Sequence, residues 1–163
     1  MKPIALLLVG SGLLLASCSK KTTDPTPPAV AVDKPALLTA HDWRITGYTL
    51  SGGQSGQTAD VYSLMTCGRD DYYDFDTDGT WRYDEGAVKC SPTSPQTRYS
   101  GTWRYDARQD YLFMTGMPFM MNNSRTRENY LDPFTVSATE LKVVFNWNDN
   151  GAQTKETLTM VSR

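Results

Sequence analysis

A six-residue segment that occurs twice restricts the middle of this chain to β-strands. The sequence GTWRYD occupies residues 79–84 and returns, 22 positions later, at residues 101–106. In both copies aromatic residues alternate with threonine and arginine, and side chains alternate between the two faces of a strand. The repeat therefore predicts two strands of one design, each with tryptophan and tyrosine on the same face. Two copies are too few to indicate a repeat protein.

Apolar and polar residues also alternate elsewhere in the chain, as they do in strands with one buried face. In residues 43–48 the alternation places Tyr48 on the face opposite Trp43, and residues 141–147 form a second such run. Helical signals are confined to residues 37–42 and 62–66. The pattern predicts an all-β domain.

Turn sequences separate the alternating runs. They occur at Asp78-Gly79, at residues 106–110 and at residues 149–151. Each lies between two predicted strands, as a β-hairpin requires. We therefore expect an antiparallel meander.

The pairing of the first hairpin can be predicted from the residues that each loop length would bring together. A two-residue turn at Asp78-Gly79 would place Phe75 opposite Arg82, a ring opposite a charge. A three-residue loop of residues 77–79 instead pairs Phe75 with Trp81, Tyr73 with Tyr83 and Asp74 with Arg82, with Gly79 at positive φ in a bulge. We predict the second arrangement.

The N-terminus resembles a bacterial lipoprotein signal. Lys2 and a long apolar run precede Leu-Ala-Ser-Cys at residues 15–18, which resembles a lipobox. The apolar run from 4 to 16 is shorter than the about 20 residues that a transmembrane helix needs, and it matches the hydrophobic part of a signal peptide. The resemblance implies a signal peptide over residues 1–17 and acylation of Cys18.

The same resemblance implies a location. Ser19 follows the cysteine, and by the sorting rules of lipoproteins this permits delivery to the outer membrane, on either face. Residues 18–36 are rich in proline and poor in apolar residues, which is typical of an extended tether. Residues 37–163 have the length of one domain. We therefore expect a lipid-anchored protein of the bacterial cell envelope.

Two cysteines, Cys67 and Cys90, remain once Cys18 is assigned to lipid. An even pair in a chain sent to an oxidising compartment favours a disulfide, and the hairpin register brings the two positions close together. Two free buried thiols are the alternative. A metal site lacks partners, because His41 is the sole histidine.

The segment from Cys67 to Trp103 resembles the lipocalin-like domain of bacterial lipoproteins. The residues that carry the resemblance are CGRDDYYDFDTDGT at 67–80, YDEGAVKC at 83–90, PQT at 95–97 and SGTW at 100–103. The resemblance implies a small antiparallel up-and-down β-barrel of about eight strands. The Gly-x-Trp signature of lipocalins is not kept, since His41 stands where glycine would precede Asp42-Trp43.

If the barrel closes, eight aromatic side chains are expected to face inward. They are Trp43, Phe75, Trp81, Tyr83, Trp103, Tyr105, Phe145 and Trp147. Such a wall suits a small hydrophobic or aromatic ligand. Alternatively the rings fill the interior, since an eight-stranded barrel holds either its own side chains or one small ligand. In that case we expect an envelope protein that acts on a protein partner.

Two segments match metal-binding patterns. Asp74, Asp76, Asp78, Gly79 and Glu85 have the spacing of a calcium-binding loop, but strand alternation before it and prolines after it argue against the flanking helices of an EF-hand. The alternative is a solvated acidic face. We assign no metal to this segment.

Methionines cluster at Met114, Met117, Met120 and Met121. Thioethers can bind Cu(I), but methionine more often fills gaps in packing, so a hydrophobic loop is the preferred interpretation.

The sequence offers little for catalysis or nucleic-acid binding. It has one histidine, no Gly-x-Ser-x-Gly elbow and no glycine-rich phosphate loop, so we assign no catalytic residue and no cofactor. The formal net charge of −2 provides no basic surface for phosphates. The expected partners are the membrane, a small hydrophobic ligand and an envelope protein.

Overall fold

The computed structural model describes residues 32–53, 55–117, 128–149 and 151–163. Val32–Arg163 form one compact unit. The expected signal peptide, Cys18 and most of the expected tether lie outside the described residues. The elements are α1 (Lys34–Leu38), β1 (Trp43–Gly52), β2 (Gln57–Asp60), α2 (Val61–Leu64), β3 (Tyr72–Phe75), β4 (Thr80–Asp84), β5 (Thr97–Asp106), β6 (Tyr111–Met114), β7 (Asn129–Leu131), β8 (Phe134–Val136), β9 (Glu140–Asp149) and β10 (Ala152–Ser162).

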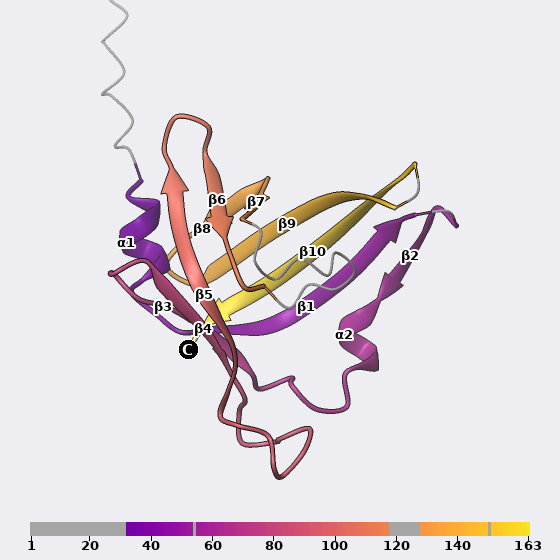
Figure 1. Cartoon of the computed structure of the whole chain (residues 1–163), viewed down its shortest axis with the longest axis horizontal. Helices are drawn as coiled ribbons and strands as arrows, with labels where there is room; N and C mark the ends of the chain where they lie inside the picture. Colours follow the sequence, from indigo (N-terminus) through magenta and orange to yellow (C-terminus); the bar gives the residue numbers. More distant parts are fainter. Residues whose placement is uncertain (1–31, 54, 118–127, 150) are drawn as a thin grey trace, which may run out of the picture. The chain divides into compact units, whose positions relative to one another are not determined.

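The strands form one antiparallel sheet in the order β7-β6-β5-β4-β3-β1-β10-β9-β8, with β2 paired to β1 (Figure 1). The all-β antiparallel class predicted from the alternation is therefore confirmed. The described strands number ten, where about eight were expected, and the extra strands are accommodated by short elements such as β7 and β8, of three residues each. The sheet ends at β7 and at β8, so a closed barrel is not confirmed.

Asp132 and Pro133 connect the two end strands. The Asp132 backbone N–H donates to the Val144 carbonyl at 2.9 Å, and the Val144 N–H donates to the Pro133 carbonyl at 3.1 Å. These bonds hold the connection against β9, and Val144 is 1% exposed. The end strands are thus fixed to the sheet even though they do not pair with each other.

The sheet curls around a core of aromatic and aliphatic side chains. Strands β3 to β7 form one half of the sheet, and β1 with β8 to β10 form the other. The two halves meet at a small cavity of about 10 Å³, where Met114 and Met117 lie with Phe75, Val143 and Met160. Tyr105 of β5 also contacts Phe134 of β8, with ring centroids 5.9 Å apart. Burial of this apolar surface, at about 25 cal/mol per Å², is the main force that holds the halves together.

The first hairpin has the predicted register. Tyr73 pairs with Tyr83, Asp74 with Arg82 and Phe75 with Trp81. Gly79 has φ +85°, a conformation that glycine adopts without steric cost. The three-residue loop is therefore confirmed.

A bulge in β1 corrects the prediction for Tyr48. The pairing of β1 with β10 shifts between Ile45 and Gly47, so one extra residue enters the strand. A bulge of this kind reverses the alternation of faces beyond it. Tyr48 consequently lies buried on the same side as Trp43 and Ile45, where simple alternation had placed it on the other face.

The compact unit begins before residue 37. Asp33 caps α1 by accepting from the Ala36 N–H at 3.1 Å. The Leu38 side chain is fully buried, and its carbonyl accepts from the Trp43 indole N–H at 2.8 Å. The α1 helix thus starts inside the segment expected as tether and belongs to the core.

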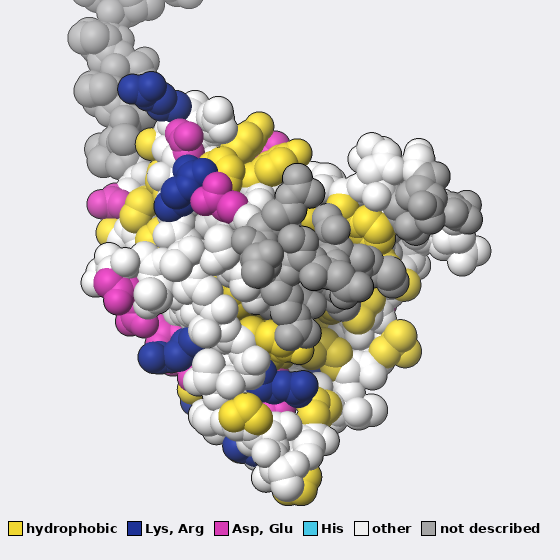
Figure 2. Space-filling view, viewed as in Figure 1, with side chains coloured by type: hydrophobic (Ala, Val, Ile, Leu, Met, Phe, Trp, Pro, Cys, Tyr) yellow, Lys and Arg dark blue, Asp and Glu magenta, His cyan; other side chains and the backbone are white. Residues whose placement is uncertain are grey.

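The surface seen in Figure 2 carries acidic and basic side chains interspersed with one another. On the outer face of β3 and β4, Arg82 forms ion pairs with Asp74 and with Asp84, the latter at 3.2 Å. The pair with Asp74 follows from the hairpin register, which sets Arg82 opposite Asp74, whereas Asp84 lies two residues farther along β4 on the same face as Arg82.

Candidate ligand pocket beside the disulfide

A pocket of about 260 Å³ opens beside the Cys67–Cys90 disulfide. Strands β1, β3, β4 and β5 each contribute one tyrosine to it. The lining residues are Ile45, Tyr48, Met65, Cys67, Gly68, Asp71, Tyr73, Tyr83, Cys90, Arg98, Tyr99 and Leu158. Ligand pockets commonly measure about 300–1,000 Å³, so this one, slightly below that range, suits only a small molecule.

Three of the tyrosines form a row across neighbouring strands. Tyr73 pairs with Tyr83, and Tyr83 pairs with Tyr99. Their ring centroids lie 4.9 Å and 5.9 Å apart, with interplanar angles of 54° and 41°. Tyr48 joins them from β1 because of the bulge. The register of the sheet therefore builds the aromatic wall of the pocket.

Three of the tyrosine hydroxyls are held in their neutral form. Burial raises the pKa of Tyr48, Tyr73 and Tyr83 above the ordinary tyrosine value. For Tyr83 the hydrogen bond and the negative charge of Asp71 raise the pKa further. Tyr48, Tyr73 and Tyr83 thus present neutral phenol rings throughout the physiological pH range.

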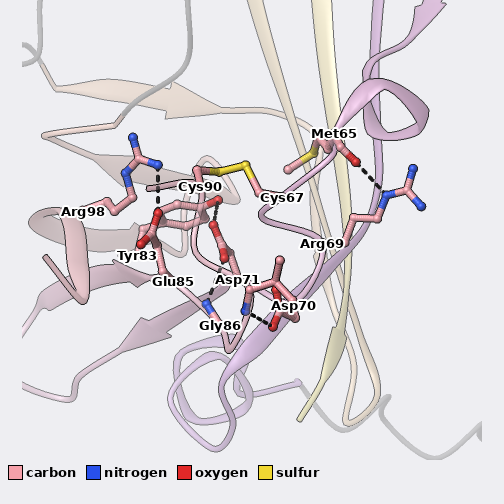
Figure 3. Close-up of a disulfide and its surroundings, with 11 residues drawn as sticks. Met65, Cys67, Arg69, Asp70, Asp71, Tyr83, Glu85, Gly86, Cys90 and Arg98 are labelled. Atoms are coloured by element: carbon pink, nitrogen blue, oxygen red, sulfur yellow. Dashed lines mark hydrogen bonds and ion pairs between the residues drawn. A yellow bond between two sulfur atoms is a disulfide. The ribbon is translucent and has the colours of Figure 1, made fainter. Parts of the chain in front are cut away.

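Asp71 is the buried carboxylate of the pocket. It accepts the Tyr83 hydroxyl at 2.7 Å and the Gly86 backbone N–H at 2.9 Å (Figure 3). Its neighbour Asp70 accepts the backbone N–H groups of Ala87 and Val88 at 2.6 Å and 3.1 Å. Two adjacent carboxylates therefore fasten the segment that leads to Cys90.

Arg98 and Glu85 form an ion pair at the pocket. The Arg98 Nη1 lies 3.0 Å from the Glu85 Oε1, and the Glu85 side chain is fully buried. The other carboxylate oxygen of Glu85 is buried without a hydrogen-bond partner among the described residues. The guanidinium also lies 5.9 Å from the Tyr99 ring centroid.

The predicted disulfide is confirmed. Cys67 and Cys90 are bonded, with Cα atoms 5.1 Å apart. In Figure 3 the bond lies between the Met65 side chain and the paired Tyr83 and Asp71. Arg69 holds the Met65 side of the pocket by donating to the Met65 and Ser63 carbonyls at 2.8 Å and 3.0 Å. The disulfide thus joins the two loops that border the pocket.

A second buried carboxylate lies behind Tyr48. The Tyr48 hydroxyl and the Trp147 indole N–H donate to the two oxygens of Glu156 at 3.4 Å and 3.2 Å. Glu156 is 1% exposed, and this burial raises its pKa. Glu156 therefore favours its protonated form more than an exposed glutamate does.

The eight aromatic residues expected to face a ligand occupy three environments. Trp43, Phe75 and Trp81 are core residues, at most 3% exposed. Trp103 and Tyr105 are half-buried and pack against that core. The remaining three line pockets: Tyr83 the pocket beside the disulfide, and Phe145 and Trp147 a second one of about 400 Å³ near Asn146.

Several pocket residues were not predicted from the sequence. Tyr73 and Tyr99 could have been found, because the register that pairs Tyr73 with Tyr83 extends to Tyr99 on the next strand. The positions of Asp71 and Arg98 in the pocket could not be predicted, since nothing in a single sequence marks a charged residue as buried beside a disulfide.

The acidic side chains that match the calcium-binding pattern contact different partners. Asp74 pairs with Arg82, Asp78 accepts from the Thr80 N–H at 2.9 Å, and Glu85 is buried against Arg98. Across the described part of the chain, no three His, Cys, Asp or Glu side chains come together as they would around a metal ion. These carboxylates serve the hairpin and the pocket.

Met114 and Met117 of the methionine cluster pack in the core. Met120 and Met121 lie outside the described residues.

The sequence matches no protein-family model, and no curated protein matches it. The residues that the structure describes include no helix long and apolar enough to span a membrane.

Proposed function

We propose that this chain is a lipid-anchored protein of the bacterial cell envelope that binds a small hydrophobic or aromatic ligand in the pocket beside the disulfide. The observation that carries the proposal is the pocket of about 260 Å³ walled by Tyr48, Tyr73, Tyr83 and Tyr99. Rings of this kind offer a large apolar surface at a low cost in conformational entropy. The protein acts in this proposal as a carrier or sensor rather than as an enzyme.

The N-terminal sequence and the disulfide support the location. Cys18 ends a lipobox-like segment followed by Ser19, which favours acylation and delivery to the outer membrane. The Cys67–Cys90 bond suits an oxidising compartment, where disulfides persist. The curled antiparallel sheet is compatible with a lipocalin-like domain, the family that the segment from 67 to 103 resembles.

A second candidate function is that of a protein-interaction module with a filled interior. The observation in its favour is that Trp43, Phe75 and Trp81 are core residues. This candidate predicts that the pocket takes up no small molecule.

Binding of N-phenyl-1-naphthylamine, a neutral aromatic fluorophore, separates the two functions. The chain from residue 18 onward, with Cys18→Ser to keep it free of lipid, should bind one equivalent saturably. Met65→Trp fills the pocket and should weaken binding at least tenfold. Leu64→Trp is the matched control, because Leu64 is 75% exposed and does not line the pocket.

Saturable binding that Met65→Trp weakens and Leu64→Trp leaves unchanged supports the carrier or sensor. Absence of saturable binding, or equal binding by Met65→Trp, contradicts it.

A further inference from the structure

We infer that the ligand of this pocket is a small organic cation, such as an alkylated ammonium, held between the tyrosine rings and drawn by the Asp71 carboxylate. The inference names the ligand class and rests on the proposed function. It follows from three features of the pocket: the inclination of its rings, its balance of charge and the engagement of its arginine.

The four tyrosines form a partial cage. Tyr73, Tyr83 and Tyr99 stand in one cross-strand row, and their planes are inclined to one another by 54° and 41° rather than stacked flat. Tyr48 adds a ring from β1. The face of an aromatic ring carries partial negative charge, and cages of several rings are the usual means by which proteins bind quaternary ammonium groups. Neutral phenols serve this purpose while keeping the pocket apolar enough to take up alkyl groups.

One carboxylate and one guanidinium line the pocket, and a second carboxylate neutralises the guanidinium from outside the lining. Asp71 lines it and is 1% exposed, and Glu85 is buried directly beside Arg98. Because Glu85 compensates Arg98 from outside the lining and no described cation pairs with Asp71, the Asp71 carboxylate leaves the pocket with a surplus of negative charge. One oxygen of Glu85 has no hydrogen-bond partner among the described residues, so the arginine does not satisfy that carboxylate fully. Opposite charges attract more strongly where water is excluded, so this surplus favours a cationic ligand.

Arg98 does not make the pocket an anion site. Its guanidinium is engaged by Glu85 at 3.0 Å and lies 5.9 Å from the centre of the Tyr99 ring. One wall of the pocket therefore already faces a cation. Glu85 therefore already neutralises this guanidinium, whereas the Asp71 carboxylate has no cationic partner among the described residues and attracts a cation.

Two probes of matched shape isolate the contribution of charge. Choline and 3,3-dimethylbutan-1-ol differ chiefly in that a quaternary nitrogen replaces a carbon. Their dissociation constants are measured by displacement of N-phenyl-1-naphthylamine from the chain that begins at residue 18 and carries Cys18→Ser. We expect choline to bind at least fivefold more tightly than the neutral alcohol.

Variants test the ring and the carboxylate separately. Tyr99→Phe keeps the ring and should keep the preference for choline, whereas Tyr99→Leu should reduce it at least threefold. Asp71→Asn should reduce it as well, while Asp76→Asn, an exposed residue outside the pocket, should not. If Asp71→Asn does not fold, as judged by circular dichroism, the comparison of Tyr99→Phe with Tyr99→Leu still tests the inference.

A preference for choline that Tyr99→Leu reduces and Tyr99→Phe retains supports the inference. Equal or tighter binding of the neutral alcohol overturns the inference and leaves the proposed function standing. If the fluorophore itself does not bind, both fail. If choline binds but Tyr99→Leu leaves its preference unchanged, the tyrosine cage is overturned.

Discussion

The Tyr83 hydroxyl donates a 2.7 Å hydrogen bond to the Asp71 carboxylate, and both residues line the pocket beside the disulfide. Tyr83 belongs to the β3–β4 hairpin, whereas Asp71 belongs to the loop that leads into β3 from Cys67. One bond therefore couples the register of the sheet to the loop that borders the pocket.

Removal of this bond should weaken the fold. Tyr83→Phe leaves a buried carboxylate with only the Gly86 N–H as a described donor, and an unsatisfied buried group costs about 1–3 kcal/mol. We expect a loss of that size in the free energy of unfolding, measured by urea denaturation. Tyr130→Phe is the control, because Tyr130 is 51% exposed. Equal stability of the two variants would show that the hydroxyl contributes nothing.

The disulfide should contribute through the unfolded state. Cys67 and Cys90 are 23 positions apart, and closing a loop of this length is worth about 3 kcal/mol in the chain-entropy model. The double variant Cys67→Ser/Cys90→Ser should have a correspondingly lower midpoint urea concentration than the wild type. Reductant should lower the midpoint of the wild type and leave that of the variant unchanged. A reductant effect on the variant would point to a cause other than this bond.

Several features followed from the sequence because they depend on neighbouring residues. The first hairpin was predicted in register, since only a three-residue loop pairs Phe75 with Trp81 and arginine with aspartate. The disulfide followed from that register together with an even cysteine pair. Both are local consequences of side-chain alternation and turn chemistry.

The pocket was less predictable because it depends on the shape of the whole sheet. The bulge between Ile45 and Gly47, which turns Tyr48 inward, was not predicted, although a glycine inside a strand is a known signal of a bulge. The expectation that eight rings share one ligand space also assumed a closed barrel. In the structure the sheet ends at β7 and β8, and Trp43 and Phe75 fill the core.

Gly86 should tolerate no side chain. A Cβ atom there would collide with the carboxylate and carbonyl oxygen of Asp70, which is fixed by the N–H groups of Ala87 and Val88. Gly86→Ala should lower the free energy of unfolding by about 1–3 kcal/mol, the usual range for overpacking. Gly47→Ala is the matched control, since its Cβ would make only ordinary contact with Thr159 at 3.5 Å. A neutral Gly86→Ala would show that the loop adjusts freely.

Glu156 should make stability depend on pH. Burial raises the pKa of Glu156 above its ordinary value of 4.5, so the folded protein binds this proton more tightly than the unfolded chain does. Its stabilising contribution is therefore complete below pH 4.5 and is lost as the pH rises through the folded pKa. Glu156→Gln cannot titrate, and its carbonyl oxygen can accept from the Trp147 indole N–H while its amide donates to the Tyr48 hydroxyl oxygen.

The difference in unfolding free energy between wild type and Glu156→Gln isolates this residue from all other titrating groups. Relative to the variant, the wild type should lose stability as the pH rises above 4.5, as measured by urea denaturation at a series of pH values. A difference that does not change with pH would contradict the assignment.

The most direct test of the central claim is a titration of the ¹⁵N-labelled chain from residue 18, carrying Cys18→Ser, with N-phenyl-1-naphthylamine, followed by amide chemical shifts. We predict saturable shifts concentrated at the pocket, at Gly68, Asp71, Arg98 and Tyr99. Shifts concentrated instead at Asn146 and Trp147 of the second pocket, or no saturable shifts at all, would contradict the assignment of the binding site.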